Sequence, residues 1–407
     1  MLDIKLIREN PNLVREKSKS KGYQVDVEKL LQADEKHKKL IEEVDALRAK
    51  RSEAAKNRDE AKGSEIKKEL KEKESSLELA SEEFYKLIRM VPNLPKDDVK
   101  EGKDENENEV VRKVGEITNF DFEPKDHMEL GVALDLIDVD TASKVAGPRF
   151  GYLKNELVLL EFALVAYAMN TLTQEGFLPI VPPVVINKNV AEGLGYPEYE
   201  NGEGYKLDDQ FLVGTAEHSI VPIHMDQTFE AKDLPRRYVG FSTAFRREAG
   251  SYGKDTKGIF RVHQFDKIEM VSFVKREDED KEHDYLLSLE EKLVQSLNLP
   301  YQVIKMCTGD LGFPTARKYD IETWIPSQKK YRETHSASTN GDFQSRRLNI
   351  KYKSGASKEY AFILNATAFA VGRTLIAIIE NNQQKDGSIL VPKVLEKYTN
   401  FKKIPRL

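Results

Sequence analysis

An apolar repeat with alternating spacings of three and four residues occupies the N-terminal part of this 407-residue chain, over residues 30–61 and again over residues 66–87. This spacing puts one apolar stripe along a helix, and a second helix must cover that stripe. Gly63–Ser64 interrupts the repeat and Pro92 follows it, so we expect two antiparallel helices that turn at Gly63–Ser64. The hairpin should span residues 27–90 as an arm too thin to enclose a domain core.

The tip of this arm is basic, although the chain as a whole carries a net charge of −5 and has no general attraction for polyanions. Between residues 46 and 68, eight basic side chains stand against four acidic ones. A charge run on a coiled coil is usually a solvated surface, but a basic patch also suits contact with a nucleic-acid backbone. The candidates for that contact are Arg48, Lys50, Arg51, Lys56 and Arg58.

A polar connector rich in Pro, Asp, Glu, Asn and Lys follows the arm over residues 92–114. Such composition is typical of a domain boundary, so we expect one domain at residues 1–105 and a second at residues 106–407.

The composition also bounds where the protein acts. No apolar run looks long enough to span a membrane, and the N-terminal residues lack the apolar core of a signal peptide, so we expect a cytoplasmic protein without a membrane partner. The single cysteine, Cys307, excludes an internal disulfide and a multi-cysteine zinc site.

Residues 236–275 predict two antiparallel strands with one apolar and one charged face. In the first strand, Val239, Phe241, Thr243 and Phe245 share a face. In the second, one parity holds Phe260, Val262, Ile268 and Met270, and the other holds Arg261, His263, Phe265, Lys267 and Glu269. The charged face could simply meet water, or it could hold a triphosphate, a purine and an ammonium group. The Gly-rich loop at 249–258 could close over such a ligand.

The run FRREAGSYGKDTKG, followed by FRVHQFDKIEM, resembles motif 2 of the seryl-tRNA synthetases, which are class II aminoacyl-tRNA synthetases. Stretches at about 150–185 and 358–383 resemble motifs 1 and 3 in family order. The resemblance implies an α+β protein with an N-terminal antiparallel two-helix coiled-coil arm that binds tRNA, and an antiparallel β-sheet catalytic domain flanked by helices. Motif 1 implies a homodimer, although a buried helix-strand pair fits that pattern equally well.

The resemblance also implies an ATP site. Arg246 and Arg373 would be catalytic, because fixed guanidinium groups stabilise charge on transferring phosphates. Glu333 and Ser336 would hold Mg²⁺ with ATP, through hard oxygen ligands. His335 stands where the family often has another residue, and we expect it to be a neighbour of the nucleotide rather than a catalyst. The implied ATP-binding residues are Arg246, Arg247, Glu248, Arg261, Val262, Phe265, Glu333, Thr334, His335, Ser336 and Arg373.

The serine site implied by the resemblance consists of Thr215, Ala216, Glu217, Glu269 and Thr367. A Thr-x-Glu triplet alone is more often a surface turn, but on an extended segment its two side chains would face one ligand together. Thr367 would recognise the serine hydroxyl, and Glu269 would hold the ammonium group.

The implied function is serine–tRNA ligase activity. The enzyme would activate L-serine with Mg-ATP to seryl-adenylate and transfer serine to the 3′ end of tRNA(Ser), with tRNA(Sec) left open as a second substrate. A class II synthetase for another amino acid, an enzyme that loads amino acids onto carrier proteins, and a catalytically silent RNA-binding relative are the alternatives. The arm disfavours the carrier-protein enzyme. The residues that disfavour the silent relative are Arg246, Arg261, Glu333 and Arg373.

Overall fold

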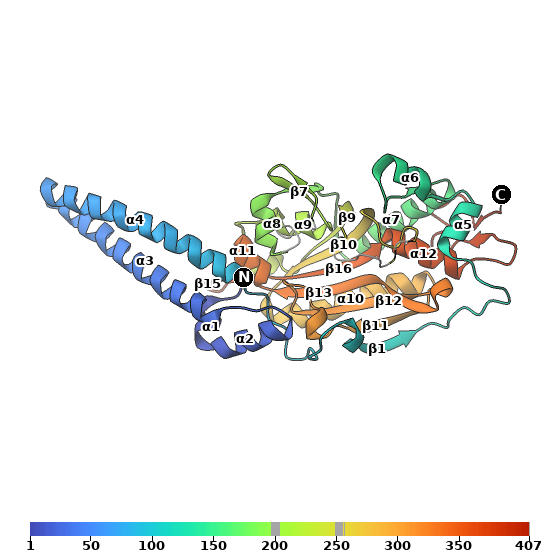
Figure 1. The fold of residues 1–407 in the computed structure, drawn as a ribbon, viewed down its shortest axis with the longest axis horizontal. Coiled ribbons are helices and arrows are strands. Elements are labelled where there is room, and N and C mark those ends of the chain that lie inside the picture. The colour runs from blue at the N-terminus through green and yellow to red at the C-terminus, as the bar shows by residue number, and fades with distance from the viewer. Residues whose placement is uncertain (197–203, 249–254, 256, 407) are drawn as a thin grey trace. The chain divides into compact units, whose positions relative to one another are not determined.

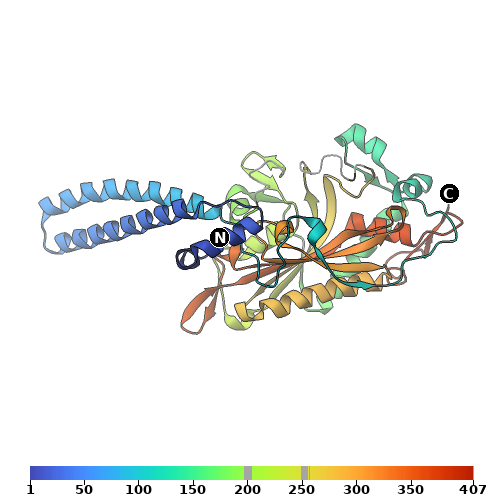
Figure 2. The ribbon, with the colours of Figure 1, turned by 60° about the horizontal axis from the view of Figure 1, so that its bottom comes forward.

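The computed structural model describes residues 1–196, 204–248, 255 and 257–406, which form two compact units, Met1–Leu94 and Pro95–Leu407 (Figures 1 and 2). Most of the loop predicted to close over a ligand, namely residues 249–254 and 256, lies outside the described residues.

The first unit is helical, and its long hairpin confirms the predicted arm. Its helices are α1 (Ile4–Glu9), α2 (Pro11–Ser20), α3 (Val27–Lys56) and α4 (Glu60–Arg89). Side chains of the predicted repeat are buried along α3 and α4 at Leu30, Ala33, Val44, Leu47, Ala54, Ile66, Leu70, Ala80 and Phe84, and those from Val44 to Leu70 form one apolar cluster. Burial of this stripe is what stabilises two helices that carry so much charge on their other faces.

The turn of the hairpin was predicted wrongly. It lies at residues 57–59, and Gly63 sits inside α4. Arg58 adopts a left-handed backbone conformation with φ 54°, and the side chain of Asp59 accepts a hydrogen bond from the backbone N–H of Lys62 at 3.1 Å. The Asp59 cap satisfies a backbone N–H at the start of α4, and the left-handed Arg58 reverses the chain just before it. The new helix therefore begins before Gly63–Ser64.

The second unit is built on an eight-stranded sheet, as the α+β prediction requires. From one edge to the other, the order is β1 (Glu109–Val114), β11 (Tyr301–Lys305), β12 (Arg317–Ile325), β13 (Lys330–Gly341), β16 (Phe362–Ala370), β10 (Gln264–Val274), β9 (Arg236–Phe245) and β4 (Leu178–Ile180). All neighbours are antiparallel except β4 and β9, which are parallel.

Smaller elements surround this sheet. The α-helices are α5 (His127–Ala133), α6 (Val139–Ala146), α7 (Glu156–Gln174), α8 (Lys188–Leu194), α9 (Glu217–Ile220), α10 (Glu279–Ser296), α11 (Phe343–Leu348) and α12 (Val371–Asn381), among the residues that the structure describes. The short strands are β2 (Ile137–Asp138), β3 (Tyr152–Leu153), β5 (Val185–Asn187), β6 (Lys206–Leu207), β7 (Gln210–Leu212), β8 (Thr228–Phe229), β14 (Lys351–Ser354), β15 (Ser357–Tyr360), β17 (Ile389–Leu390) and β18 (Lys403–Ile404).

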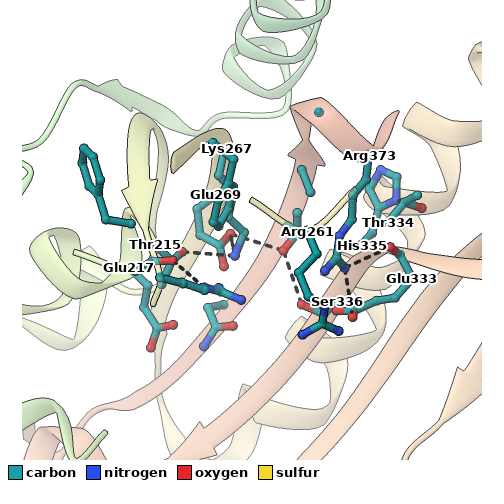
Figure 3. Close-up of a pocket in the computed structure, with 18 of the residues that line it drawn as sticks. Thr215, Glu217, Arg261, Lys267, Glu269, Glu333, Thr334, His335, Ser336 and Arg373 are labelled. Atoms are coloured by element: carbon teal, nitrogen blue, oxygen red, sulfur yellow. Dashed lines mark hydrogen bonds and ion pairs between the residues drawn. The ribbon is translucent and has the colours of Figure 1, made fainter. Parts of the chain in front are cut away.

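Alternation along β10 separates a core face from a polar face. Ile268 and Met270 are fully buried in an apolar cluster with residues of α7, α10 and α12. Lys267 and Glu269 point the other way, because successive strand residues face opposite sides of a sheet (Figure 3). The prediction of one apolar and one charged face is therefore correct for this strand.

Helix α7 is long and apolar enough to cross a membrane by length and composition, so the expectation that no run would reach that length was wrong. Leu157, Leu160, Leu164 and Leu172 of this helix are fully buried in the main apolar cluster. A core helix and a membrane span share this composition, and here the burial against the sheet accounts for part of the apolar content.

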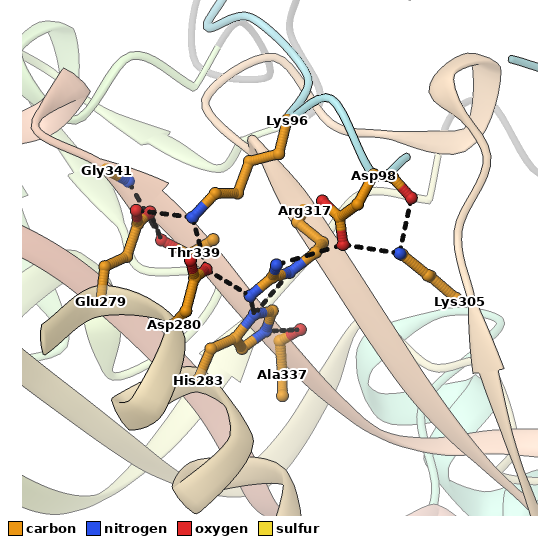
Figure 4. A network of polar contacts seen from close by, with 10 residues as sticks. All are labelled: Lys96, Asp98, Glu279, Asp280, His283, Lys305, Arg317, Ala337, Thr339 and Gly341. Atoms are coloured by element: carbon orange, nitrogen blue, oxygen red, sulfur yellow. Dashed lines mark hydrogen bonds and ion pairs between the residues drawn. The ribbon is translucent and has the colours of Figure 1, made fainter. Parts of the chain in front are cut away.

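The start of the predicted connector is anchored within the second unit by a network of charged groups (Figure 4). The Lys96 ammonium lies 2.7 Å from a carboxylate oxygen of Glu279 on α10, and Asp98 accepts hydrogen bonds from Lys305 and Arg317. β1 then pairs with β11. The compact second unit therefore begins at Pro95, before the boundary expected at residue 105.

Candidate active site

A cavity of about 520 Å³ in the second unit collects most of the residues that the sequence singled out (Figure 3). Those that line it are Thr215, Glu217, Arg246, Glu248, Arg261, Val262, Phe265, Glu269, Glu333, Thr334, His335, Ser336, Thr367 and Arg373. Ala216 and Arg247 do not line it. Residues from four separate stretches of the chain thus meet in one space.

Strand register explains much of this convergence. Glu269 on β10 pairs with Thr367 on β16, and the Thr367 hydroxyl donates to Glu269 Oε2 at 3.3 Å. The Ser336 hydroxyl on β13 lies 3.3 Å from that of Thr367. β10 begins at Gln264, so residues 260–263 are not in the strand, contrary to the prediction.

At one end of the cavity, Glu217 is completely enclosed. Its carboxylate accepts hydrogen bonds from the Tyr196 hydroxyl at 2.8 Å and from the Gln344 amide at 2.9 Å. Burial raises the pKa of Glu217 to about 7, since an enclosed carboxylate loses the solvation that favours its charge. Neither Tyr196 nor Gln344 is among the residues predicted for the site, although Gln344 lies in the run DFQSRR at residues 342–347.

The Thr-Ala-Glu segment was predicted to be extended, and this prediction is wrong. Ala216 has a helical backbone and Glu217 opens α9, so Thr215 and Glu217 reach the cavity from the start of a helix. The Ala216 side chain is fully buried in a second apolar cluster that includes Ile220. The turn into α9 therefore separates Ala216 from the ligand side.

At the other end, Arg373 lies in the first turn of α12 and contacts Glu333. Its Nη1 donates to a carboxylate oxygen and to the backbone oxygen of Glu333, both at 3.1 Å. Burial alone would raise the pKa of Glu333, but Lys318 and Arg373 outweigh burial and lower that pKa to about 2. β16 runs to Ala370 and so carries the chain directly into α12.

Between these ends lie Arg246, Arg261 and Phe265. Arg246 Nε donates to the Gly214 carbonyl at 3.1 Å, and its guanidinium carbon lies 5.3 Å from the centre of the Phe265 ring. Arg261 pairs with Glu248 at 2.8 Å. A guanidinium and an aromatic face placed together suit a ligand with both phosphates and a planar base.

Two of the predicted ATP-binding residues, Arg247 and His335, have surroundings that do not suit direct contact with phosphate. The Arg247 guanidinium lies 5.3 Å from the centre of the Tyr205 ring, outside the cavity lining. His335 is buried, and burial lowers its pKa to about 3. Its imidazole is therefore neutral at physiological pH, as expected for a neighbour rather than a general acid or base.

Known proteins resemble the chain along its whole length. Residues 1–95 match the family described as seryl-tRNA synthetase N-terminal domain, and residues 203–382 match the tRNA synthetase class II core domain (G, H, P, S and T). The serine–tRNA ligase of Dictyoglomus turgidum is 41% identical and aligns with 99% of both chains. The chain belongs to the serine–tRNA ligase family.

Solved structures agree with this membership of the serine–tRNA ligase family. Seryl-tRNA synthetase from Pyrococcus horikoshii, complexed with ATP, has a TM-score of 0.91 and 38% identity, with complete coverage of both chains. The cytoplasmic enzyme from Naegleria fowleri, in complex with AMP, has a TM-score of 0.89 and 31% identity, covering 100% of this chain and 99% of that one. The family and the fold predicted from the motifs are confirmed, and the chain is a class II aminoacyl-tRNA ligase.

A metal ion bound in this cavity would have few protein ligands. In the part of the chain that the structure describes, no group of three or more His, Cys, Asp or Glu side chains is arranged to hold a metal ion. Glu333 and Ser336 both line the cavity with oxygen donors, and the low pKa of Glu333 keeps it ionised. This donor set fits Mg²⁺, which keeps several waters and takes further ligands from phosphates.

The five basic residues singled out in the arm are all exposed. Arg48 pairs with Glu74 of α4 at 3.0 Å, and Arg58 forms part of the turn. A nucleic-acid backbone can therefore reach these groups without any change in the packing of α3 against α4.

Proposed function

We propose that this chain activates L-serine with Mg-ATP to form seryl-adenylate and pyrophosphate, and then transfers serine to the 3′ end of tRNA(Ser). The observation that carries the proposal is one cavity, which has Arg373 at one end, Arg246 over Phe265 between the ends, and two carboxylates with a threonine hydroxyl at the other end. The family match along the whole chain supports the same reading, as does the ATP named with the Pyrococcus horikoshii structure.

In the first step, a carboxylate oxygen of serine attacks the α-phosphorus of ATP, and pyrophosphate leaves. We assign Arg246 to the α-phosphate, where its fixed charge stabilises the negative charge of the transition state. Arg261 and Arg373 then hold the outer phosphates. Phe265 stacks on the adenine, with Glu248 and the backbone of Val262 at its edge.

Glu333 and Ser336 are the residues that would hold Mg²⁺, which, when bound, neutralises phosphate charge. In the structure, Glu333 pairs with Arg373, and its pKa of about 2 favours the ionised carboxylate. We therefore assign to Arg373 the task of sharing its charge between Glu333 and the γ-phosphate.

The amino acid is selected at the other end. Glu269 and Glu217 attract its ammonium group, and Thr367 hydrogen-bonds its hydroxyl. Alanine lacks that hydroxyl and so loses this hydrogen bond, which is worth about 0.5–1.5 kcal/mol, while Thr367 keeps its contacts with Glu269 and Ser336. Selection against alanine therefore follows from hydrogen bonding rather than from size.

In the second step, a ribose hydroxyl at the 3′ end of the tRNA attacks the carbonyl carbon of seryl-adenylate, and AMP leaves. We assign tRNA binding to the N-terminal unit, through Arg48, Lys50, Arg51, Lys56 and Arg58. Pro95–Leu407 then forms the catalytic domain. tRNA(Sec) is a second substrate to be tested with the same assay.

A homodimer is the proposed assembly, and we place it in the cytoplasm, where tRNA is charged. Helix α7 exposes 49% of Leu159 and 60% of Phe162, and Val181 just after β4 is 75% exposed. Apolar side chains this exposed favour a partner surface.

The variant Phe162→Glu tests this surface and should be a monomer in sedimentation, with an unfolding temperature within a few degrees of wild type. A variant that remains dimeric would contradict the proposed dimer surface.

The experiment for the proposed activity is ATP–pyrophosphate exchange with each of the twenty amino acids. Serine should support exchange and the other amino acids should not do so appreciably. Exchange driven by another amino acid would indicate a different class II enzyme, and no exchange at all would indicate a catalytically silent relative.

A further inference from the structure

Lys267 lies at the amino-acid end of the cavity, and the mechanism above gives it no part. The residue is 7% exposed and contributes to the cavity lining. A lysine this buried is uncommon, because its ammonium loses hydration unless nearby groups replace the lost water. Its partners therefore show what the residue does.

The ammonium of Lys267 has two partners on different elements (Figure 3). Nζ lies 2.6 Å from Glu269 Oε2 and donates to the Thr215 hydroxyl oxygen at 3.1 Å. Glu269 stands two residues along β10, so a pair between these two residues alone would be an ordinary contact within one strand. The bond to Thr215 is different, because Thr215 belongs to the segment that leads into α9.

The same carboxylate oxygen joins a third element to this link. Glu269 Oε2 also accepts a hydrogen bond from the Thr367 hydroxyl of β16 at 3.3 Å. Thr215, Lys267, Glu269 and Thr367 thus form one chain of hydrogen bonds across the amino-acid end. Since Oε2 already accepts two bonds, Oε1 is the oxygen left to receive a substrate ammonium group.

We propose that Lys267 is a positioning residue that fixes the width of the amino-acid end by linking Thr215 to Glu269, and that it thereby supports selection of serine over threonine. The inference rests on the proposed serine activation. Threonine differs from serine by one methyl group, so a pocket rejects it only if the residues around the serine side chain stay in place. The bonds from Lys267 to Thr215 and Glu269 are charge-assisted and therefore stronger than neutral hydrogen bonds, so they resist widening of this pocket.

The test compares Lys267→Met, which keeps the length of the side chain but loses its charge and donors, with the wild-type chain in pyrophosphate exchange. The KM for serine should rise about tenfold while the KM for ATP stays within about twofold, because the ATP contacts are unchanged. The ratio of kcat/KM for serine to that for threonine should fall about tenfold. Lys353→Met, at an exposed lysine of β14, is the matched control and should change none of these values.

Two outcomes would overturn the inference: an unchanged serine KM with unchanged discrimination, or a rise of the serine and ATP KM values together. If Lys267→Met does not fold, as judged by thermal unfolding, Lys267→Gln replaces it, since its amide donates without charge. Lys267→Gln should show the same changes at smaller size, and wild-type behaviour would overturn the proposal. A wild-type chain without serine-dependent exchange would instead refute the proposed function.

Discussion

At the scale of single residues, two carboxyl groups in one cavity are driven in opposite directions. Burial raises the pKa of Glu217 to about 7, whereas Lys318 and Arg373 lower that of Glu333 to about 2. Their surroundings therefore give the two glutamates different charge states: the pKa of Glu333 favours a carboxylate at physiological pH, whereas Glu217 changes its charge near pH 7.

The first prediction concerns the pH dependence of serine binding. Below about pH 7, Glu217 becomes neutral and attracts an ammonium group less, so the serine KM should rise by up to about tenfold per pH unit. Measurements of KM from about pH 8 to 5.5 check this. Glu217→Gln should bind serine weakly at every pH, without that rise. A wild-type serine KM that stays flat would remove Glu217 from ammonium recognition.

The same shift has a sign for stability. The folded pKa of Glu217 lies above the ordinary value of 4.5, so its contribution to stability is complete below pH 4.5 and is lost as pH rises through about 7. The loss amounts to about 3 kcal/mol for this shift. Urea unfolding at the two ends of this range, in wild type and Glu217→Gln, measures the effect.

The second prediction is that Arg246→Ala lowers the rate of pyrophosphate exchange by about three orders of magnitude, because a fixed charge at the α-phosphate is lost. The neighbouring Arg247→Ala is the comparison, since that guanidinium lies over Tyr205 outside the cavity. Its exchange rate should stay within about threefold of wild type. Equal losses in the two variants would contradict the assignment to Arg246.

At the scale of elements, the arm shows what periodicity does and does not predict. The repeat correctly predicts two helices and their buried stripe, since a stripe of apolar residues must be covered. It does not place the turn, because Gly63 can enter a helix at a cost of about 1 kcal/mol when a nearby cap such as Asp59 starts the helix.

The third prediction follows from this correction. Gly63→Ala should stabilise the arm by about 1 kcal/mol, since Gly63 lies in α4 and a Cβ there would meet nothing within 4 Å. Asp59→Ala should destabilise it by about 1 kcal/mol through loss of the cap. Helix content on heating, followed by circular dichroism, measures both. If Gly63→Ala instead destabilises the arm, the turn lies at Gly63 and not at residues 57–59.

The candidate site divides in the same way. Strand alternation predicts that Lys267 and Glu269 share a face, and the motifs indicate most of the cavity residues. Alternation cannot reveal the turn at Ala216, because a short apolar segment has no periodicity to distinguish strand from helix. Nor can it find the contact of Glu217 with Tyr196 and Gln344, because these bonds join residues distant in sequence.

At the scale of the whole molecule, we assign tRNA recognition to the first unit and serine activation to the second. The fourth prediction is that replacing Arg48, Lys50, Arg51, Lys56 and Arg58 together by alanine leaves pyrophosphate exchange within about twofold of wild type. The KM for tRNA in serylation should rise at least about tenfold, with a weaker salt dependence, because phosphate contacts are lost.

A matched control replaces five exposed lysines elsewhere: Lys385, Lys393, Lys397, Lys402 and Lys403. It removes the same charge and should leave the tRNA KM near that of wild type. If both sets weaken tRNA binding equally, net charge rather than the arm is responsible. If the arm variant loses exchange as well, the arm residues support folding instead.

The most direct measurement for the central claim is a crystal structure with a non-hydrolysable analogue of seryl-adenylate. The account predicts that its adenine lies on Phe265, its phosphate at Arg246, and its seryl group between Glu269 and Thr367. An analogue bound outside this cavity, or one whose seryl group lies among Arg261, Glu333 and Arg373, would contradict the claim that one cavity joins ATP to serine.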